Sequence, residues 1–181
     1  ETLFCAAVHL KSQRADTDEL PAQLSPRQSR VLGRALATTK RLLEAAGLRN
    51  LLDDAIETRA ADHFAVLGDF NDGPDSPTLA ALKALDDDEL GTLEFMEQRR
   101  LFAATRQIPR ELAFSYMRRG RRQLMDGILV SPQLSLGLVA AGIENQLLEG
   151  DIYWHSERVP GYPRSDHAPV WATFELPART G

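Results

Sequence analysis

The sequence has one cysteine, no long hydrophobic run and no excess of positive charge. Cys5 alone cannot form an internal disulfide or a four-cysteine zinc site, and its apolar surroundings indicate a core residue rather than a catalytic thiol. No apolar run is long enough to span a bilayer. The formal net charge of -5 argues against coating nucleic acid through bulk charge, so only a local basic patch would bind it.

The length and composition are those of one globular domain. At 181 residues, with 43% hydrophobic and 26% charged residues, the chain is long enough to bury a substantial core. It has no internal repeat, no low-complexity linker and no domain boundary, so we expect a single domain over residues 1–181. The sequence opens at Glu1 directly in a strand-like run, and we therefore expect a piece of a longer protein.

Two helices are predicted. Apolar residues recur at helical spacing from Ser25 or Pro26 to Ala46, and Gly47 provides a stop signal. A second, short helix is expected at residues 78–85, directly after a proline. Between the two, residues 50–59 form either a short helical continuation or an irregular connection.

Strands are predicted between and after these helices. The polar, glycine-containing tip at residues 118–122 indicates a hairpin between the strand-like runs 113–117 and 124–130. The other predicted strands are residues 3–10, 64–67, 136–143, 151–155 and 168–176. Strands mixed with helices in this way predict an α/β fold.

The stretch at residues 64–78, FAVLGDFNDGPDSPT, combines a strand end with chemically active side chains. An apolar run leads into Gly68, and Asp69, Asn71 and Asp72 follow almost at once. The loops that follow buried strands are where α/β proteins place their chemistry. We therefore expect a carboxylate and a carboxamide of this stretch to belong to a functional site.

Similar residues occur at three other predicted strand ends. Each group alone is weak evidence, because a lone Asp or His at a strand end is more often a satisfied loop residue. Their joint occurrence, with Asp, Asn and His as the residue types, indicates a catalytic centre. The four groups are His9 with Lys11 and Ser12, Asp69 with Asn71, Asp126 in MDGILVS, and Asp166 with His167.

The segments VHLKS, GDFNDGPDSP, MDGILVS and SDHAPV resemble, in this order, the successive signatures of the endonuclease/exonuclease/phosphatase superfamily. That superfamily includes DNase I-like and exonuclease III-like nucleases, inositol polyphosphate phosphatases, neutral sphingomyelinases and deadenylases. The resemblance spans residues 8–170. It implies an α/β fold that is part of a four-layer αββα sandwich of the DNase I-like type. The chain would supply the C-terminal two-thirds of that domain, with the N-terminal strands missing.

The resemblance also implies five catalytic residues. Asp69 resembles the carboxylate that positions or activates the attacking water, and Asn71 the amide that orients the scissile phosphate. His167 resembles the imidazole that contacts the phosphate, and Asp126 its buried partner, which fixes the tautomer and raises the pKa of the ring. His9 resembles a second histidine of the nuclease members, which acts as a phosphate ligand or general acid.

A divalent cation is implied by the same resemblance. Mg²⁺ or Mn²⁺ held by Asp69, Asn71 and Asp166 would neutralise charge on the phosphate oxygens. The family's first metal ligand is a glutamate from the N-terminal half of the domain, and no glutamate of this sequence stands in a matching context. We therefore expect the isolated chain to bind metal weakly and to turn over slowly. A surface left open by missing strands also suggests a homodimer.

Basic side chains near the predicted catalytic strand ends are candidates for substrate binding. Either they hold phosphates at the rim of the site, or they only keep an exposed hairpin tip soluble. They are Lys11, Arg118, Arg119, Arg121 and Arg122.

Taken together, the residues and the resemblance predict a metal-dependent phosphoesterase. Hydrolysis of a phosphodiester by an activated in-line water, as in a nuclease, is the first expectation, and nucleic acid is then a candidate substrate. The alternatives are a phosphomonoesterase or lipid-headgroup hydrolase on the same scaffold, because specificity resides in loops, and a catalytically incomplete binding fragment.

Overall fold

The main sheet of the computed structural model consists, in this order, of strands β1 (Leu3–His9), β2 (His63–Asp69), β6 (Asp126–Val130) and β3 (Phe102–Ala103). β1 and β2 run parallel, while β6 is antiparallel to both β2 and β3. The strands predicted at residues 3–10 and 64–67 are therefore confirmed, whereas the core position expected for Cys5 is wrong, because its side chain is exposed on β1. The structure describes residues 1–84, 98–118, 120–148 and 165–176.

Helix α1 (Pro26–Glu57) joins β1 to β2 and is longer than predicted. It begins as expected, with a capping box in which the side chains of Ser25 and Gln28 each accept a hydrogen bond from the other's backbone N–H. The predicted end at Gly47 is wrong, because the helix continues for about three more turns. Leu52 in this continuation is fully buried, and such packing outweighs the roughly 1 kcal/mol that a glycine costs inside a helix.

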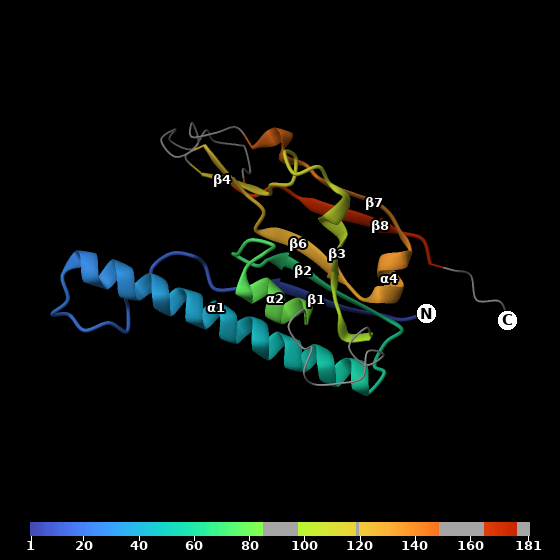
Figure 1. Cartoon of the computed structure of the whole chain (residues 1–181), viewed down its shortest axis with the longest axis horizontal. Coiled ribbons are helices and arrows are strands. Elements are labelled where there is room, and N and C mark those ends of the chain that lie inside the picture. The colour runs from blue at the N-terminus through green and yellow to red at the C-terminus, as the bar shows by residue number, and fades with distance from the viewer. Residues whose placement is uncertain (85–97, 119, 149–164, 177–181) are drawn as a thin grey trace.

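Helices α1 and α2 (Pro77–Lys83) cover one face of the main sheet (Figure 1). The short helix predicted at residues 78–85 is thus confirmed, and Ser76 caps it by accepting from the N–H of Leu79. The core that these helices share with the sheet consists of Leu10, Ala45, Leu52, Val66, Phe70, Leu79, Leu82, Leu101 and Leu129.

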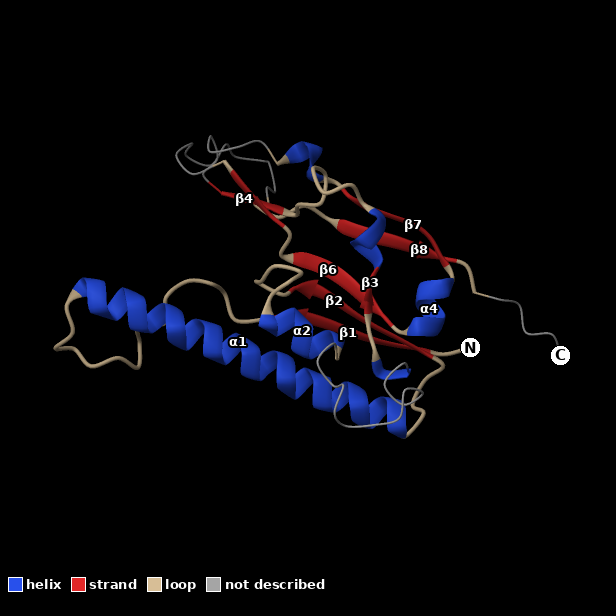
Figure 2. Ribbon diagram, in the orientation of Figure 1, coloured by secondary structure: helices blue, strands red, loops and turns tan. Residues whose placement is uncertain are grey.

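The opposite face of the main sheet is covered by helix α4 (Pro132–Leu136) and by the antiparallel pair β7 (Leu138–Ile143) and β8 (Val170–Phe174). The strands predicted at residues 136–143 and 168–176 are confirmed. The first of them begins at Leu138, because residue 136 is the last residue of α4. The order is therefore helices, main sheet and second sheet (Figure 2). The buried cluster on this face is Ala65, Val130 and Leu134, with Ile128 and Phe174 packed against it.

A hairpin at this tip is confirmed, but its strands are not the two that were predicted: the run 124–130 is largely the separate strand β6. The hairpin consists of β4 (Tyr116–Arg118) and β5 (Arg121–Gln123), with Gly120 at a φ of 71° in the turn. β6 leaves the hairpin and pairs with β2 and β3, because its apolar side chains are buried in the main sheet. The arginines expected in a loop tip therefore lie largely on short strands.

Two 3-10 turns, η1 (Ala104–Gln107) and η2 (Asn145–Leu147), complete the elements of the described residues. The strand predicted at residues 151–155 lies outside them. None of the helices in the described ranges is long and apolar enough to cross a membrane.

Candidate active site

Strand register brings three of the predicted residues to one edge of the main sheet. His9, the last residue of β1, pairs with Asp69, the last residue of β2. Asp69 in turn pairs with Asp126, the first residue of the antiparallel strand β6. The ends of two parallel strands and the start of an antiparallel one coincide at this edge, so residues far apart in the sequence become neighbours.

Two glycines allow the backbone to pack tightly beside this row. Gly68 has a φ of 138°, and a Cβ there would lie 2.0 Å from the carbonyl oxygen of Val8 on the neighbouring strand. Only glycine fits this conformation and this spacing. A Cβ at Gly127 would lie 3.2 Å from the ring of Phe70, the buried residue that follows Asp69.

His167 joins the row from the segment that precedes β8. Its Nδ1 lies 2.7 Å from Oδ2 of Asp126, and its Nε2 lies 3.9 Å from Oδ2 of Asp69. Its ring also packs on Tyr116, with the ring centroids 4.8 Å apart. The hydrogen bond with Asp126 raises the pKa of His167, although partial burial acts against it.

Asp69 and Asn71 are tied together by a tight loop. Asn71 adopts a φ of 52°, and its backbone N–H donates to Oδ1 of Asp69 over 2.7 Å. Its Nδ2 donates to the carbonyl oxygen of Leu10 over 2.9 Å and to Oδ2 of Asp69 over 3.0 Å. Burial raises the pKa of Asp69, the Asn71 N–H lowers it, and the nearby Asp126 raises it further. His9 Nε2 lies 3.5 Å from the same carboxylate.

Asp72 forms a clamp that the sequence analysis did not identify. Its Oδ2 accepts from Nε of Arg41 over 3.0 Å and from Oγ1 of Thr78 over 2.8 Å. Arg41, which is 4% exposed, also donates to the carbonyl oxygen of Lys11. The pair therefore fixes α1, the end of β1 and the loop after β2 against one another, and no local pattern around Arg41 signals this role.

Ser115 is a second residue that sequence reasoning missed. It is fully buried, and its Oγ accepts from the backbone N–H groups of Met125 and Asp126 over 3.0 and 2.9 Å. Its carbonyl oxygen accepts from the N–H of Ala168, next to His167. Ser115 thereby links the backbones that carry the Asp126–His167 pair. A serine between strand-forming residues carries no sequence signal of such a role.

The carboxylates of this cluster suit a hard divalent cation. Asp69, Asp126 and His167 each offer one ligand atom, and these atoms lie within 4.8 Å of one another. Carboxylate oxygens are the ligands that Mg²⁺ and Mn²⁺ prefer, whereas the imidazole suits them less well. Of the metal ligands that were predicted, Asp69 belongs to this cluster and Asn71 is bonded to it. Asp166 is exposed and lies outside the cluster.

The predicted basic residues occupy different environments. Nζ of Lys11 lies 3.5 Å from Oδ2 of Asp16, so this lysine is paired within the chain. Arg118 and Arg121 are exposed and face each other in register across the hairpin.

The other two hairpin arginines differ. Arg122 packs 4.5 Å over the ring of Phe114 and donates to the carbonyl oxygen of Glu111, so it is engaged structurally. Arg119 lies outside the described residues.

The chain is similar to known proteins in both sequence and fold. Residues 8–153 match a model of the "Endonuclease/Exonuclease/phosphatase family". A structure of the 3′ phosphatase NExo from Neisseria bound to a product DNA hairpin is similar, with 20% identity and a TM-score of 0.53. The 3′-5′ exonuclease NExo from Neisseria meningitidis also matches, with 20% identity and a TM-score of 0.51. Each alignment covers 95% of this chain and 61% of the other. A search of curated proteins gave no match.

These structural neighbours confirm the expected fold class, an α/β fold of the DNase I-like type, to which the described residues contribute a helical layer and two sheets. The chain spans 61% of the length of these neighbours. Because the family model matches most of the sequence, the chain belongs to the endonuclease/exonuclease/phosphatase family.

Proposed function

We propose that the chain carries the centre of a metal-dependent phosphoesterase that hydrolyses phosphodiesters. The observation that supports this most directly is the convergence of Asp69, Asp126 and His167 from three separate segments at one sheet edge. Membership of the family supports the reaction class. The proposal thus includes the use of a divalent metal, the cleavage of a phosphodiester bond and a phosphodiester substrate.

The proposed roles follow from the contacts. Asp126 holds Nδ1 of His167, which leaves Nε2 directed toward the Asp69 side of the cluster. The hydrogen bond with Asp126 raises the pKa of His167 and so favours the protonated ring, which in the proposal donates a hydrogen bond to a phosphoryl oxygen. Asp69, whose pKa is raised by burial, is a stronger base than an exposed carboxylate and accepts the proton of the attacking water.

His9 and Asn71 have supporting roles in this proposal. His9 is exposed beside Asp69, where its ring meets the phosphate or protonates the leaving oxygen. Asn71 holds Asp69 in place through two hydrogen bonds. The Nδ2 group of Asn71 donates both of its hydrogen bonds within the chain, to Asp69 and to the carbonyl oxygen of Leu10. The phosphate-orienting role expected for Asn71 stays a prediction.

Asp69 and Asp126 would hold the cation, with the amide of Asn71 beside them. When bound, Mg²⁺ or Mn²⁺ neutralises negative charge on the phosphate oxygens. Asp166 as a ligand remains a prediction, as does the homodimer.

Phosphomonoester hydrolysis is the second candidate, because one structural neighbour is a 3′ phosphatase. The two reactions are separated by comparing bis(4-nitrophenyl) phosphate with 4-nitrophenyl phosphate in Mg²⁺ or Mn²⁺. We expect the diester to be the better substrate. Higher turnover of the monoester would replace the first proposal with the second.

The site itself is tested with matched aspartate variants. Asp69→Ala is expected to lower metal-dependent turnover of the diester by roughly 100-fold or more, because it removes the proposed base and metal ligand. Asp75→Ala removes an exposed aspartate from the same loop and is expected to leave turnover unchanged. Equal activity of the two variants would overturn the assignment of Asp69.

A further inference from the structure

Helix α1 extends well beyond the catalytic edge of the main sheet. Its 32 residues span about 48 Å, whereas the seven residues of β2 span about 23 Å. Arg41 marks the edge, since it contacts Asp72 and the carbonyl oxygen of Lys11 there. α1 runs back along the parallel strands that it connects, so the part of the helix that precedes Arg41 projects past the site (Figure 1).

The projecting part of α1 carries uncompensated positive charge. Arg34 and Arg30 lie about two and three turns before Arg41 on the same stripe of the helix. Both are exposed, and neither forms an ion pair with any residue that the structure describes. Lys40, by contrast, is paired with Asp16 and Glu19, and its charge is neutralised within the chain.

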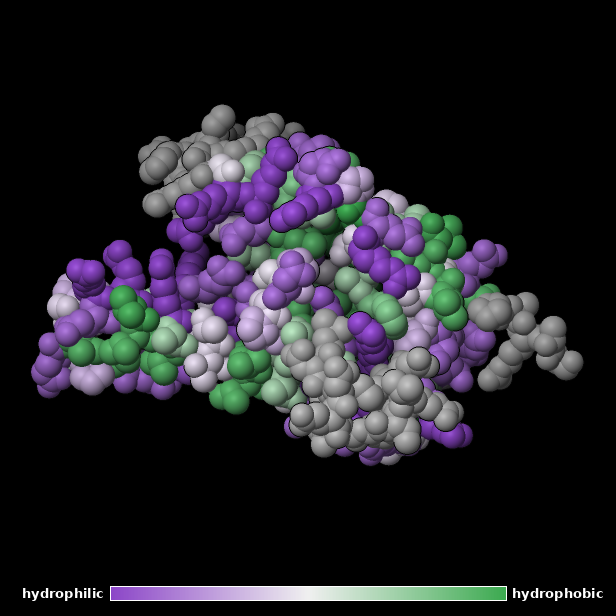
Figure 3. Space-filling view, viewed as in Figure 1, coloured by the Kyte–Doolittle hydropathy of each residue, from purple (hydrophilic) through white to green (hydrophobic). Residues whose placement is uncertain are grey.

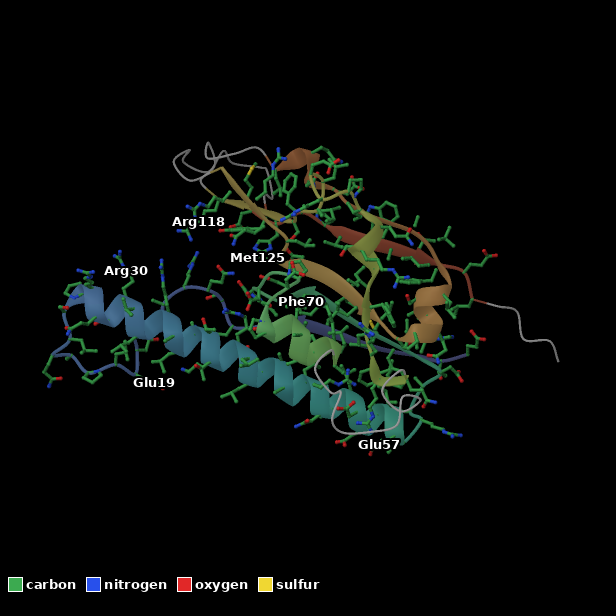
Figure 4. The ribbon with its side chains drawn as sticks, in the orientation of Figure 1. Glu19, Arg30, Glu57, Phe70, Arg118 and Met125 are labelled. Carbon is green, nitrogen blue, oxygen red and sulfur yellow. The ribbon has the colours of Figure 1, made fainter. Side chains whose placement is uncertain are left out.

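A second pair of arginines lies across the site on the β4–β5 hairpin. Arg118 and Arg121 are exposed and in register, and β5 leads within a few residues to Asp126. Tyr116, the first residue of β4, packs on His167, so the hairpin is anchored at the catalytic cluster. In Figure 4, Arg30 rises from α1 on the side of the hairpin, and Arg118 lies on the hairpin side that borders α1. Figure 3 shows hydrophilic side chains on both sides of the notch between them.

We infer that Arg30 and Arg34, together with Arg118 and Arg121, form a phosphate track for a polynucleotide. This inference rests on the proposed function, and it names the substrate class as a nucleic acid rather than a small phosphate ester. Arg30 lies about 16 Å along α1 from Arg41 at the catalytic edge, a distance that corresponds to about five successive phosphates on one strand of a duplex. It binds phosphates remote from the scissile one, which no mononucleotide or sugar phosphate possesses.

The overall charge of the chain opposes the binding of a polyanion. The chain has a net charge of -5, so bulk attraction does not bring a polyanion to it. Exposed arginines on two elements that border the catalytic cluster therefore provide a local and directional attraction. Arginine also suits phosphate because its planar group donates two parallel hydrogen bonds.

The track is tested by DNA binding, with EDTA present to prevent hydrolysis. The probe is a fluorescein-labelled 16-base-pair duplex of arbitrary sequence, and the readout is fluorescence anisotropy of the full chain. We expect Arg30→Gln/Arg34→Gln to weaken binding by roughly tenfold at 0.1 M salt and to reduce the slope of log K against log salt by about two. The control, Arg59→Gln/Arg100→Gln, removes the same charge from the opposite end of α1 and its neighbourhood, and should bind like the wild type.

Two outcomes of the binding experiment would overturn the inference. Equal weakening by both double variants would show a dependence on net charge alone and overturn the track. Unchanged binding by Arg30→Gln/Arg34→Gln, with circular dichroism like that of the wild type, would overturn it as well. Turnover of bis(4-nitrophenyl) phosphate by the wild type reports on the proposed function separately. If the wild type does not hydrolyse this diester, the proposed phosphodiesterase function is contradicted. The DNA-binding measurements still test the phosphate track independently.

Discussion

His167 depends on Asp126 for both its position and its raised pKa. The 2.7 Å hydrogen bond between Asp126 and Nδ1 of His167 orients the ring and raises its pKa. Ser115 fixes Asp126 in turn, because its Oγ accepts from the backbone N–H of Asp126. Asp69 is held in the same manner by the Asn71 N–H and side chain. Asp69 and His167 are therefore each oriented by a neighbour whose own position is fixed by hydrogen bonds, which is the arrangement that preorganised catalysis requires.

The His167–Asp126 pair makes the stability of the metal-free protein depend on pH. Because the folded-state pKa of His167 lies above its unfolded value of 6.5, the pair stabilises the fold fully below about pH 6.5. We expect this contribution to be lost as pH rises through the folded-state pKa. Urea unfolding with EDTA between pH 6 and 9 measures it.

Asp126→Asn is the control for this pH dependence. It keeps the shape of the side chain and removes the charge that raises the pKa of His167. The decline in the free energy of unfolding above pH 6.5 should be smaller in this variant. An identical decline in both proteins would show that another group is responsible.

Helix α1 and strand β2 show how the same residue type has opposite consequences in two elements. Gly47 lies inside α1, and a Cβ added there would meet nothing within 4 Å. Gly68 lies at the end of β2 with a φ of 138°, and a Cβ there would collide with the carbonyl oxygen of Val8. The first glycine is a cost that the helix tolerates, and the second is required by the approach of β1 to β2 just before the catalytic edge.

Two Gly→Ala variants test this difference with the same chemical change. Gly47→Ala is expected to raise the free energy of unfolding by about 0.5–1 kcal/mol, because alanine favours the helix and restricts the unfolded chain. Gly68→Ala is expected to lower it by more than about 2 kcal/mol, through collision and backbone strain. Urea unfolding of both variants provides the measurement, and similar effects of both would contradict the structure of β2.

At the scale of the whole molecule, the two faces of the main sheet are covered by different elements. The helical face supplies most of the core, and α1 carries its arginines past the catalytic edge. The second sheet on the other face contains β8, which follows His167, whereas β6, which begins at Asp126, belongs to the main sheet itself. The site lies where the two halves meet, so its assembly depends on the complete packing of both faces. The chain spans 61% of the length of its structural neighbours, and its weak metal binding remains an expectation.

Metal binding is measurable as a change in the stability of the whole chain. If Mn²⁺ binds Asp69 and Asp126 in the folded state only, a concentration ten times its Kd stabilises the protein by about 1.4 kcal/mol. We expect a rise in Tm with millimolar Mn²⁺ that disappears in Asp69→Asn but persists in Asp75→Asn. A rise of the same size in all three proteins would place the cation elsewhere.

The sequence by itself determined the strand ends, the residues that they carry and the family. Strand-forming runs, the GDFND loop and the SDH segment are local patterns, and they predicted Asp69, Asp126 and His167 before their proximity was known. Turn chemistry and side-chain periodicity act over a few residues, so a sequence alone reveals them.

Only the tertiary structure decided how these pieces meet. β6 pairs with β2 rather than with the hairpin, α1 continues through Gly47, and Arg41 reaches Asp72 from a distant helix turn. Ser115 likewise acquires its role from contacts with two distant segments. Strand partners, buried ion pairs and helix ends chosen by packing depend on contacts between residues far apart in the chain, which no local pattern encodes.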